Sequence, residues 1–264
     1  MLQPRIVTRA EWLLARRAHL AKEKELTRLR DEVTRGGRAL PWVKVDKDYV
    51  FDGPNGPETL ADLFEGRNQL IVYHFMFRPD WEYGCPSCSY VADHIDPTIV
   101  HLAHRDVTFR VVSRAPIDQI EAFRERMGWK FHWVSSFRNE FNYDYNVSFP
   151  PERIVDGTIM YNFTTVEVGS EVPLDEREGI SVFSRGADGA IYHTYSTYER
   201  GVDLFVGTYN WLDIVPKGRD EDGLAFKMAW LRHHDRYDDE YRVDEVSGYP
   251  FPPRIAHSCC ESHT

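Results

Sequence analysis

Two cysteines three positions apart, Cys85 and Cys88, are the residues of this chain whose type and spacing point most directly to chemistry. They stand in the segment Gly84-Cys85-Pro86-Ser87-Cys88, which follows an apolar run and in which Pro86 suits the first position of a helix. At a helix start, unpaired backbone N–H groups and the helix dipole lower the pKa of a thiol, and the thiolate is the reactive form. We therefore predict that Cys85 is accessible and attacks, while Cys88, one turn deeper on the same face, resolves the mixed disulfide.

The same two cysteines could instead bind a metal or do no chemistry. The chain has no second Cys-x-x-Cys that would complete a four-cysteine zinc site. Two thiolates and one imidazole would suit copper, and three histidines from elsewhere in the chain are candidates for the third ligand: His74, His132 and His193. The third hypothesis is a non-catalytic scaffold with incidental cysteines. For the oxidoreductase we expect no cofactor, and we interpret Cys259 and Cys260 as terminal thiols.

An arginine and four aromatic residues are candidates for substrate binding. Arg114 follows the C-terminal end of a predicted strand, where open parallel sheets bind their ligands. It could hold an anionic substrate or stabilise the Cys85 thiolate, and an ion pair with a neighbour explains it equally well. The aromatic candidates for the walls of a pocket, which core packing explains equally well, are Trp81, Tyr83, Trp133 and Tyr143.

The elements that must position these residues alternate between strands and helices. The continuous apolar run 70–77 predicts a central strand covered on both faces. We predict further strands over 107–112 and 131–134, a helix over 117–127, and a helix from the dithiol toward residue 105 that bends or breaks at Pro97. A hairpin of residues 179–183 and 190–195 follows, around a Gly-Ala-Asp-Gly turn. This order predicts an α/β fold, a central sheet with helices on its faces.

The remaining segments extend this domain or interrupt it. We predict an N-terminal helical extension over 1–37, with its helix over 11–33, and a main domain over 38–217 that begins with a strand over 42–51 and a short helix over 59–64. Residues 137–178 form an aromatic-rich inserted loop, and a helical stripe covers 202–212. Residues 218–264 are predicted to carry a helix at about 224–237, with His233-His234-Asp235 at its charged end, and a tail.

Composition excludes several functions. The formal net charge is −10 and the pI is about 5.6, which argues against general binding of nucleic acid. No stretch approaches the roughly 20 apolar residues that span a bilayer, so we expect no membrane partner, and the first residues do not resemble a targeting signal. Four cysteines in 264 residues are too few for a disulfide scaffold, so a reducing, cytoplasmic compartment fits best. A homo-oligomer is possible.

Several segments along almost the whole chain resemble a family of bacterial thioredoxin-like proteins of uncharacterised function, described as predicted dithiol-disulfide oxidoreductases. The segments are FRPDWEYGCPSC (77–88), VVSRAP (111–116), MGW (127–129), WVSS (133–136), FNYD (141–144), SVF (181–183), HTYSTY (193–198), LD (212–213) and PKGR (216–219). The resemblance implies a thioredoxin-like central sheet and a thiol-disulfide oxidoreductase. Its partners would be a disulfide-containing or oxidised-sulfur substrate and an external thiol reductant.

Three more distant comparisons bear on the chemistry. The strand-loop-cysteine arrangement is similar to peroxiredoxins, which place Thr or Ser three residues before the reactive cysteine, whereas Glu82 stands there in this chain. Thioredoxin-like enzymes place a cis-proline just before the strand that faces the dithiol, but here Pro173 lies well upstream of the strand that begins at Gly179. A thioredoxin fold with two cysteines and a distant histidine is also similar to copper chaperones of cytochrome oxidase assembly, which is the basis of the copper alternative.

Overall fold

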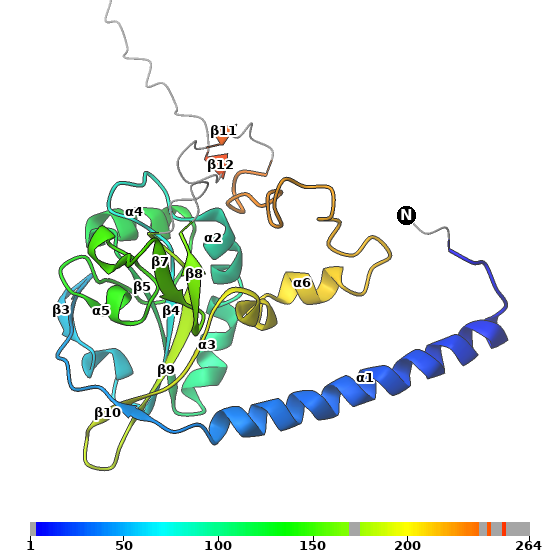
Figure 1. Ribbon diagram of the computed structural model, residues 1–264, viewed down its shortest axis with the longest axis horizontal. Helices are drawn as coiled ribbons and strands as arrows, with labels where there is room; N and C mark the ends of the chain where they lie inside the picture. Colours follow the sequence, from blue (N-terminus) through cyan, green and yellow to red (C-terminus); the bar gives the residue numbers. More distant parts are fainter. Residues whose placement is uncertain (1–3, 169–174, 238–241, 244–249, 252–264) are drawn as a thin grey trace, which may run out of the picture. The chain divides into compact units, whose positions relative to one another are not determined.

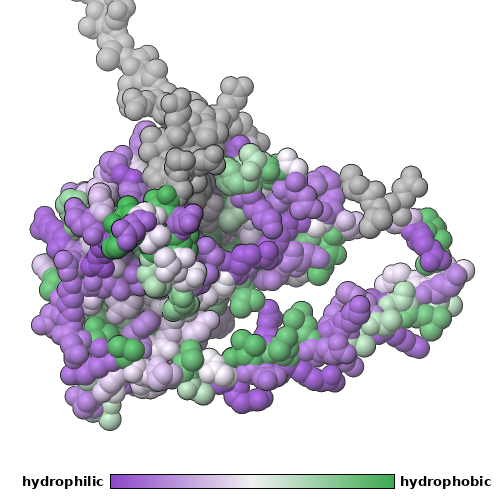
Figure 2. All heavy atoms as spheres, in the orientation of Figure 1, coloured by the Kyte–Doolittle hydropathy of each residue, from purple (hydrophilic) through white to green (hydrophobic). Residues whose placement is uncertain are grey.

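The structure is a computed structural model that describes residues 4–168, 175–237, 242–243 and 250–251, and the chain divides into two compact units, residues 1–42 and 43–264. The first unit carries helix α1 (Arg9–Arg38), labelled in Figure 1. Its start is a capping box in which the Thr8 hydroxyl accepts from the Glu11 N–H at 3.3 Å and the Glu11 carboxylate accepts from the Thr8 N–H at 2.9 Å. No α1 residue is buried, and Figure 2 shows its apolar side chains at the surface among hydrophilic ones.

The second unit is built on an eight-stranded sheet with the order β1-β10-β9-β4-β5-β6-β2-β3. Strands β4, β5 and β6 are parallel, whereas β9 pairs antiparallel with β4 and β10 antiparallel with β9. The predicted α/β fold, with a thioredoxin-like central sheet and flanking helices, is confirmed (Figure 1). The strands of this sheet are β1 (Val43–Lys44), β2 (Val50–Gly53), β3 (Gly56–Thr59), β4 (Gln69–His74), β5 (Val107–Ser113), β6 (Trp133–Ser135), β9 (Gly179–Arg185) and β10 (Ile191–Thr197).

Short helices connect these strands. They are η1 (Asp62–Phe64), α2 (Pro86–Ala92), α3 (Asp96–Ala103), α4 (Ile117–Arg126), η3 (Glu199–Phe205) and α6 (Gly207–Leu212). The helix predicted to bend or break at Pro97 is two helices, because α2 ends at Ala92 and α3 begins just before Pro97. A proline is tolerated in the first turn of a helix, where its missing N–H would have no partner in any case, so the break precedes it.

Successive side chains of the central strands enter two different cores. On β4, Tyr73 belongs to the same buried cluster as the two cysteines, whereas its neighbour Val72 belongs to the cluster on the other face. Helices α2 and α4 supply side chains to the dithiol cluster, and η1 and residue Phe141 supply the other one. The dithiol therefore lies on one face of the sheet.

Three predicted segments differ from the structure. The strand predicted over 42–51 is only β1 and the start of β2, and residues 224–237 form turns instead of a helix. The insertion 137–178 is not an open loop, because its described part contains α5 (Phe141–Asp144), η2 (Pro151–Arg153), β7 (Thr158–Tyr161) and β8 (Thr164–Glu167) and has its own buried cluster.

A further pair of strands, β11 (Arg242–Val243) and β12 (Pro250–Phe251), lies near the end, while Cys259 and Cys260 lie outside the described residues. No helix in the described part of the chain is both long and apolar enough to cross a membrane.

Candidate dithiol site

The two cysteines begin helix α2, as their spacing predicts. Cys85 is the N-cap residue, Pro86 is the first helical residue, and the Ser89 N–H donates to the Cys85 carbonyl at 2.9 Å. Both residues carry free thiols. Proline cannot donate the N–H that an interior helical position requires, so the helix begins at Pro86. Cys85 is therefore left at the N-cap position.

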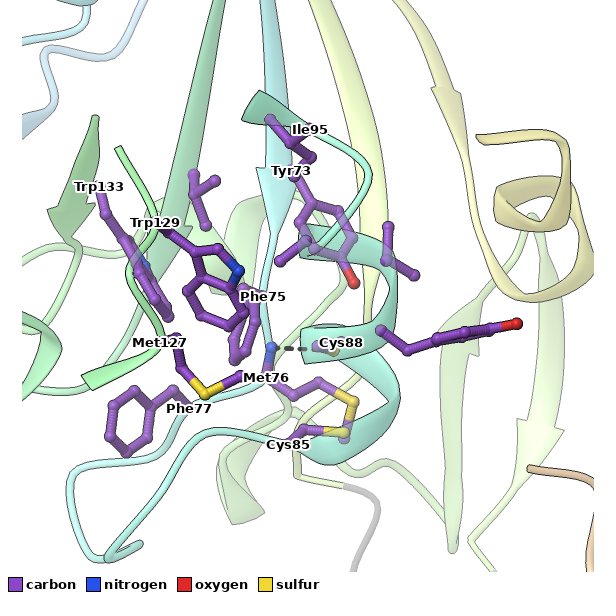
Figure 3. Close-up of a cluster of buried hydrophobic side chains, with 14 of the residues drawn as sticks. Tyr73, Phe75, Met76, Phe77, Cys85, Cys88, Ile95, Met127, Trp129 and Trp133 are labelled. Carbon is purple, nitrogen blue, oxygen red and sulfur yellow. Dashed lines mark hydrogen bonds between the residues drawn. The ribbon is translucent and has the colours of Figure 1, made fainter. Parts of the chain in front are cut away.

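The backbone of Met76 holds both cysteines. Its carbonyl accepts from the Cys85 N–H at 3.0 Å, and its N–H donates to the Cys88 Sγ at 3.4 Å (Figure 3). Met76 lies two residues past the end of β4, so the central strand of the sheet fixes the position of both residues. This arrangement places a backbone donor on Cys88 before any reaction takes place.

The prediction that Cys85 faces solvent is wrong, because both cysteines are only 1% exposed. The loop before α2 packs closely on the core at Gly84, where a Cβ atom would come within 2.6 Å of the Phe75 ring and 2.7 Å of the Phe123 ring. Only glycine permits this close approach without displacing the rings. The loop is therefore drawn inward, and it carries the first sulfur into the dithiol cluster.

The two thiols have different acidities. Burial opposes ionisation of Cys85, but hydrogen bonds from the Cys88 thiol and from the backbone N–H groups of Cys88 and Ser87 outweigh it, so the pKa of Cys85 lies below its ordinary value. Burial raises the pKa of Cys88 well above its ordinary value, and the hydrogen bond to Cys85 and the charge on Cys85 raise it further. Cys85 is thus the thiol that ionises first, and Cys88 keeps its proton.

His233 supports the loop that carries the dithiol, a role that the sequence did not indicate. It is fully buried, and its Nε2 lies 2.8 Å from the Gly84 carbonyl oxygen. The Arg126 guanidinium donates to His233 Nδ1 at 3.2 Å, so Nδ1 carries no proton and Nε2 is the donor to Gly84. Burial lowers the pKa of His233 to about 4, and the positive charge of Arg126 acts in the same direction. Of the predicted charged helix end, His233 is therefore a neutral buried group, whereas Asp235 is exposed and pairs with Arg126.

A carboxyl group also acts on the dithiol. Glu178 precedes β9, whose first residue Gly179 pairs with His74 of β4. After burial and the mutual hydrogen bonds of the two thiols, the negative charge of Glu178 is a further cause that raises the pKa of both. Glu178 stands just before β9, at the position where thioredoxin-like enzymes have a cis-proline. No cis peptide bond occurs among the described residues.

Arg114 has two partners in the insertion. Its Nη1 donates to Glu176 Oε1 at 2.8 Å, and its guanidinium lies over the Tyr143 ring at 4.7 Å. The Glu176 side chain is 1% exposed and also accepts from the Ser148 hydroxyl at 2.9 Å. Arg114 therefore joins the end of β5 to the insertion in this structure, which is the ion-pair alternative that the sequence left open.

The predicted aromatic residues do not all meet. Trp133 is fully buried, donates to the Ser113 hydroxyl at 3.1 Å and belongs to the dithiol cluster, so it packs in the core. Trp81 and Tyr83 are half-buried and pack against that cluster, with Arg126 lying 4.8 Å from the Tyr83 ring centre. Tyr143 is in the insertion beside Arg114 and apart from the cluster.

The histidines proposed as copper ligands do not join the cysteines. His74 is fully buried on the other face of β4, where it hydrogen-bonds to Ser181 Oγ at 2.9 Å. His193 bonds to Ser196 Oγ at 2.7 Å, and His132 bonds to the Glu58 carboxylate at 2.8 Å. The two-residue period of a strand places His74 opposite Tyr73, which explains the separation. Within the described residues no group of three or more His, Cys, Asp or Glu side chains could hold a metal ion.

With the fold and site defined, comparison with known proteins gives the family. The chain belongs to the family described as "Bacterial protein of unknown function (DUF899)", whose model matches residues 1–237. A comparison with curated proteins found no match.

Solved structures give weaker likenesses. Peroxidoxin BcpB from Mycobacterium tuberculosis is 12% identical with a TM-score of 0.42, covering 64% of this chain and 95% of that one. A peroxiredoxin Q structure from Xanthomonas campestris is 12% identical with a TM-score of 0.39, covering 65% and 96%. A candidate thiol:disulfide interchange protein DsbE from Chlorobium tepidum is 10% identical with a TM-score of 0.37, covering 62% and 92%.

Proposed function

We propose that this protein is a thiol-disulfide oxidoreductase that uses Cys85 as the attacking thiolate and Cys88 as the resolving thiol. The observation that carries the proposal is the unequal pair at the start of α2. Hydrogen bonds from Cys88 and from two backbone N–H groups overcome the effect of burial and lower the pKa of Cys85, while burial raises the pKa of Cys88. Cys85 is therefore the thiolate that attacks, and Cys88 remains a protonated thiol until the second step.

The reaction divides into two exchanges. The Cys85 thiolate attacks a substrate disulfide, one S–S bond forms and one breaks, and the first substrate sulfur leaves as a thiolate. Cys88 then attacks the Cys85 sulfur, and the second substrate sulfur leaves and takes up the proton that Cys88 gives off. The substrate gains two electrons, and the protein holds a Cys85–Cys88 disulfide. An external thiol reductant returns the two electrons, which fits a reducing compartment such as the cytoplasm.

Access to the dithiol must be transient. Both cysteines are 1% exposed, so a substrate disulfide reaches Cys85 only when a covering segment opens. Local opening of loops is common and costs less than global unfolding. We place this opening in the loop before α2, since Trp81 and Tyr83 within it are only half-buried. The substrates that fit best are disulfides and other oxidised sulfur compounds, not peroxides, because Glu82 stands where peroxiredoxins have Thr or Ser.

Disulfide reduction by single-cysteine variants tests the proposal. The chain has four cysteines, so a Cys259→Ser/Cys260→Ser background leaves only the dithiol. In that background we expect Cys85→Ser to abolish turnover of a small disulfide, and Cys88→Ser to stop after one exchange with the substrate bound to Cys85, which mass spectrometry detects. Equal turnover in Cys85→Ser and the background protein would contradict the proposal.

A further inference from the structure

The hydroxyl of Tyr73 is buried without an acceptor. Tyr73 is fully buried on the dithiol face of β4, and its Oη has no hydrogen-bond partner. The buried tyrosines 161, 198 and 209 each donate the hydroxyl to an oxygen 2.9 to 3.2 Å away, whereas the hydroxyl of Tyr90, like that of Tyr73, has no hydrogen-bond partner. A buried donor without an acceptor destabilises a fold, so its presence calls for an explanation.

The partner toward which this hydroxyl is directed is Cys88. Figure 3 shows the Tyr73 hydroxyl pointing to the turn of α2 that carries Cys88. Burial raises the pKa of Cys88, and the nearby Tyr73 hydroxyl opposes that rise. A thiol sulfur is a weak acceptor and a thiolate is a strong one. The Tyr73 hydroxyl would therefore gain a strong acceptor once Cys88 loses its proton.

Two donors thus converge on one sulfur. The Met76 N–H already donates to Cys88 Sγ at 3.4 Å, and the Tyr73 hydroxyl adds a second, side-chain donor. Donors fixed in advance around a site where negative charge develops stabilise that charge at no cost in reorganisation, and more strongly in a buried site than in water. The mixed-disulfide stage is when Cys88 needs this help, because Cys85 then carries no charge and no longer competes for the proton.

We propose that Tyr73 is a catalytic residue of the second exchange, in which its hydroxyl donates a hydrogen bond to the Cys88 thiolate as that sulfur attacks the Cys85–substrate disulfide. The inference rests on the proposed function. The Tyr73 proton stays on the phenol oxygen throughout. The proton of Cys88 leaves with the released substrate thiol, a Cys85–Cys88 bond forms, and the bond between Cys85 and the substrate breaks.

Tyr73→Phe removes only this hydroxyl, and a two-step reporter separates the exchanges. In the background without the tail cysteines, 5,5′-dithiobis(2-nitrobenzoate) releases one coloured thiolate on attack by Cys85 and a second on resolution by Cys88. We expect the first rate to change less than about twofold and the second to fall about tenfold, the usual effect of a lost hydrogen bond to a charged group. Tyr90→Phe is the matched control, since Tyr90 belongs to the same cluster and its buried hydroxyl also has no hydrogen-bond partner, but it is Thr208, not a cysteine, that lowers its pKa. Both rates should hold in this variant. A second rate in Tyr73→Phe equal to that of the background protein would overturn the inference.

A titration of Cys88 tests Tyr73 independently of turnover. In protein labelled with [3-¹³C]cysteine, the Cβ resonance of Cys88 reports its ionisation without a reagent. We expect the pKa of Cys88 to be higher in Cys85→Ser/Tyr73→Phe than in Cys85→Ser by about one unit. Equal values would overturn the role of Tyr73 whether or not the protein reduces disulfides. Failure of the background protein to release any reporter, with the Cys88 shift present, would contradict the proposed function alone.

Discussion

At the scale of single residues, the dithiol depends on neighbours within α2 and on one residue far away in the chain. The pKa of Cys85 is lowered, in spite of burial, by hydrogen bonds from Cys88 and two backbone N–H groups, which are local to α2. The loop that carries it is held by His233, which lies 149 positions away from its partner Gly84. The chemistry of the pair therefore depends both on a helix start and on a distant support.

Replacing Gly84 tests how tightly the loop packs. A Cβ atom at this position would meet the rings of Phe75 and Phe123 at 2.6 and 2.7 Å. We expect Gly84→Ala to lower the free energy of unfolding by about 1–3 kcal/mol, the usual cost of overpacking, as measured by urea denaturation. Gly223→Ala is the control, since a Cβ there meets nothing within 4 Å. Equal stabilities of the two variants would show that the loop yields easily.

Acid should weaken the support that His233 gives. Its folded-state pKa is about 4 because burial lowers it, whereas the unfolded chain protonates near 6.5. Between those values the unfolded state binds the extra proton, so stability falls as the pH drops from about 6.5 to about 4. The side chain of His233→Gln cannot titrate. We therefore expect the free energy of unfolding of this variant to fall by on the order of 3 kcal/mol less than that of the wild type over this pH range. Parallel profiles for wild type and His233→Gln would contradict the assignment.

At the scale of elements, the insertion is a folded part of the domain and not a free loop. Strands β7 and β8 pair within it, and its buried cluster includes Val147, Phe149 and Tyr161. It is fastened to the end of β5 by the ion pair of Arg114 and the buried Glu176. Burial raises the pKa of Glu176 to about 7 although Arg114 and Ser148 stabilise its charged form. The ion pair requires an ionised Glu176, so it weakens as the pH falls below about 7.

Removing Arg114 distinguishes fastening from substrate binding. Arg114→Met leaves a buried carboxyl group without its cation, and we expect a loss of about 3 kcal/mol in thermal or urea unfolding. Arg138→Met is the matched control, since Arg138 is exposed and its ion pair with Asp52 should be worth less than about 0.5 kcal/mol. Unchanged stability together with a raised KM for a disulfide substrate would instead assign Arg114 to the substrate.

At the scale of the whole molecule, the chain has two compact units with different physical support. Residues 43–264 contain the buried clusters, whereas α1 buries none of its residues and is supported by its own hydrogen bonds and capping box. Exposed leucines, such as Leu14, Leu26 and Leu29, lie along it. The dithiol and every group assigned to it lie in the larger unit.

Deleting residues 1–40 should leave that unit intact. The deletion removes α1 and retains β1, and because none of the described residues it removes is buried we expect the free energy of unfolding to change by less than about 0.5 kcal/mol. Disulfide turnover should be the same as in the full chain, measured in parallel with denaturation. A loss of several kcal/mol would show that α1 supports the sheet.

By itself the sequence determined the succession of strands and helices around the dithiol and the start of α2 at Cys85 and Pro86. These features depend on local signals, namely apolar runs, glycine and the missing N–H of proline. The lack of a helix over 224–237 was not predictable in this way, because His233 bonds to the carbonyl of Gly84, 149 positions away, in a contact that no local pattern encodes.

Only the tertiary structure decided whether the dithiol reaches solvent and which groups act on it. Burial of Cys85 depends on Gly84 packing against rings from the end of β4 and from α4, and the separation of His74 from the cysteines depends on the face of β4 that each core covers. Tyr73 is on the opposite face, where its buried hydroxyl points to the turn of α2 that carries Cys88. Such contacts form only when distant segments pack, so spacing along the chain determined the reactive pair and packing determined its surroundings.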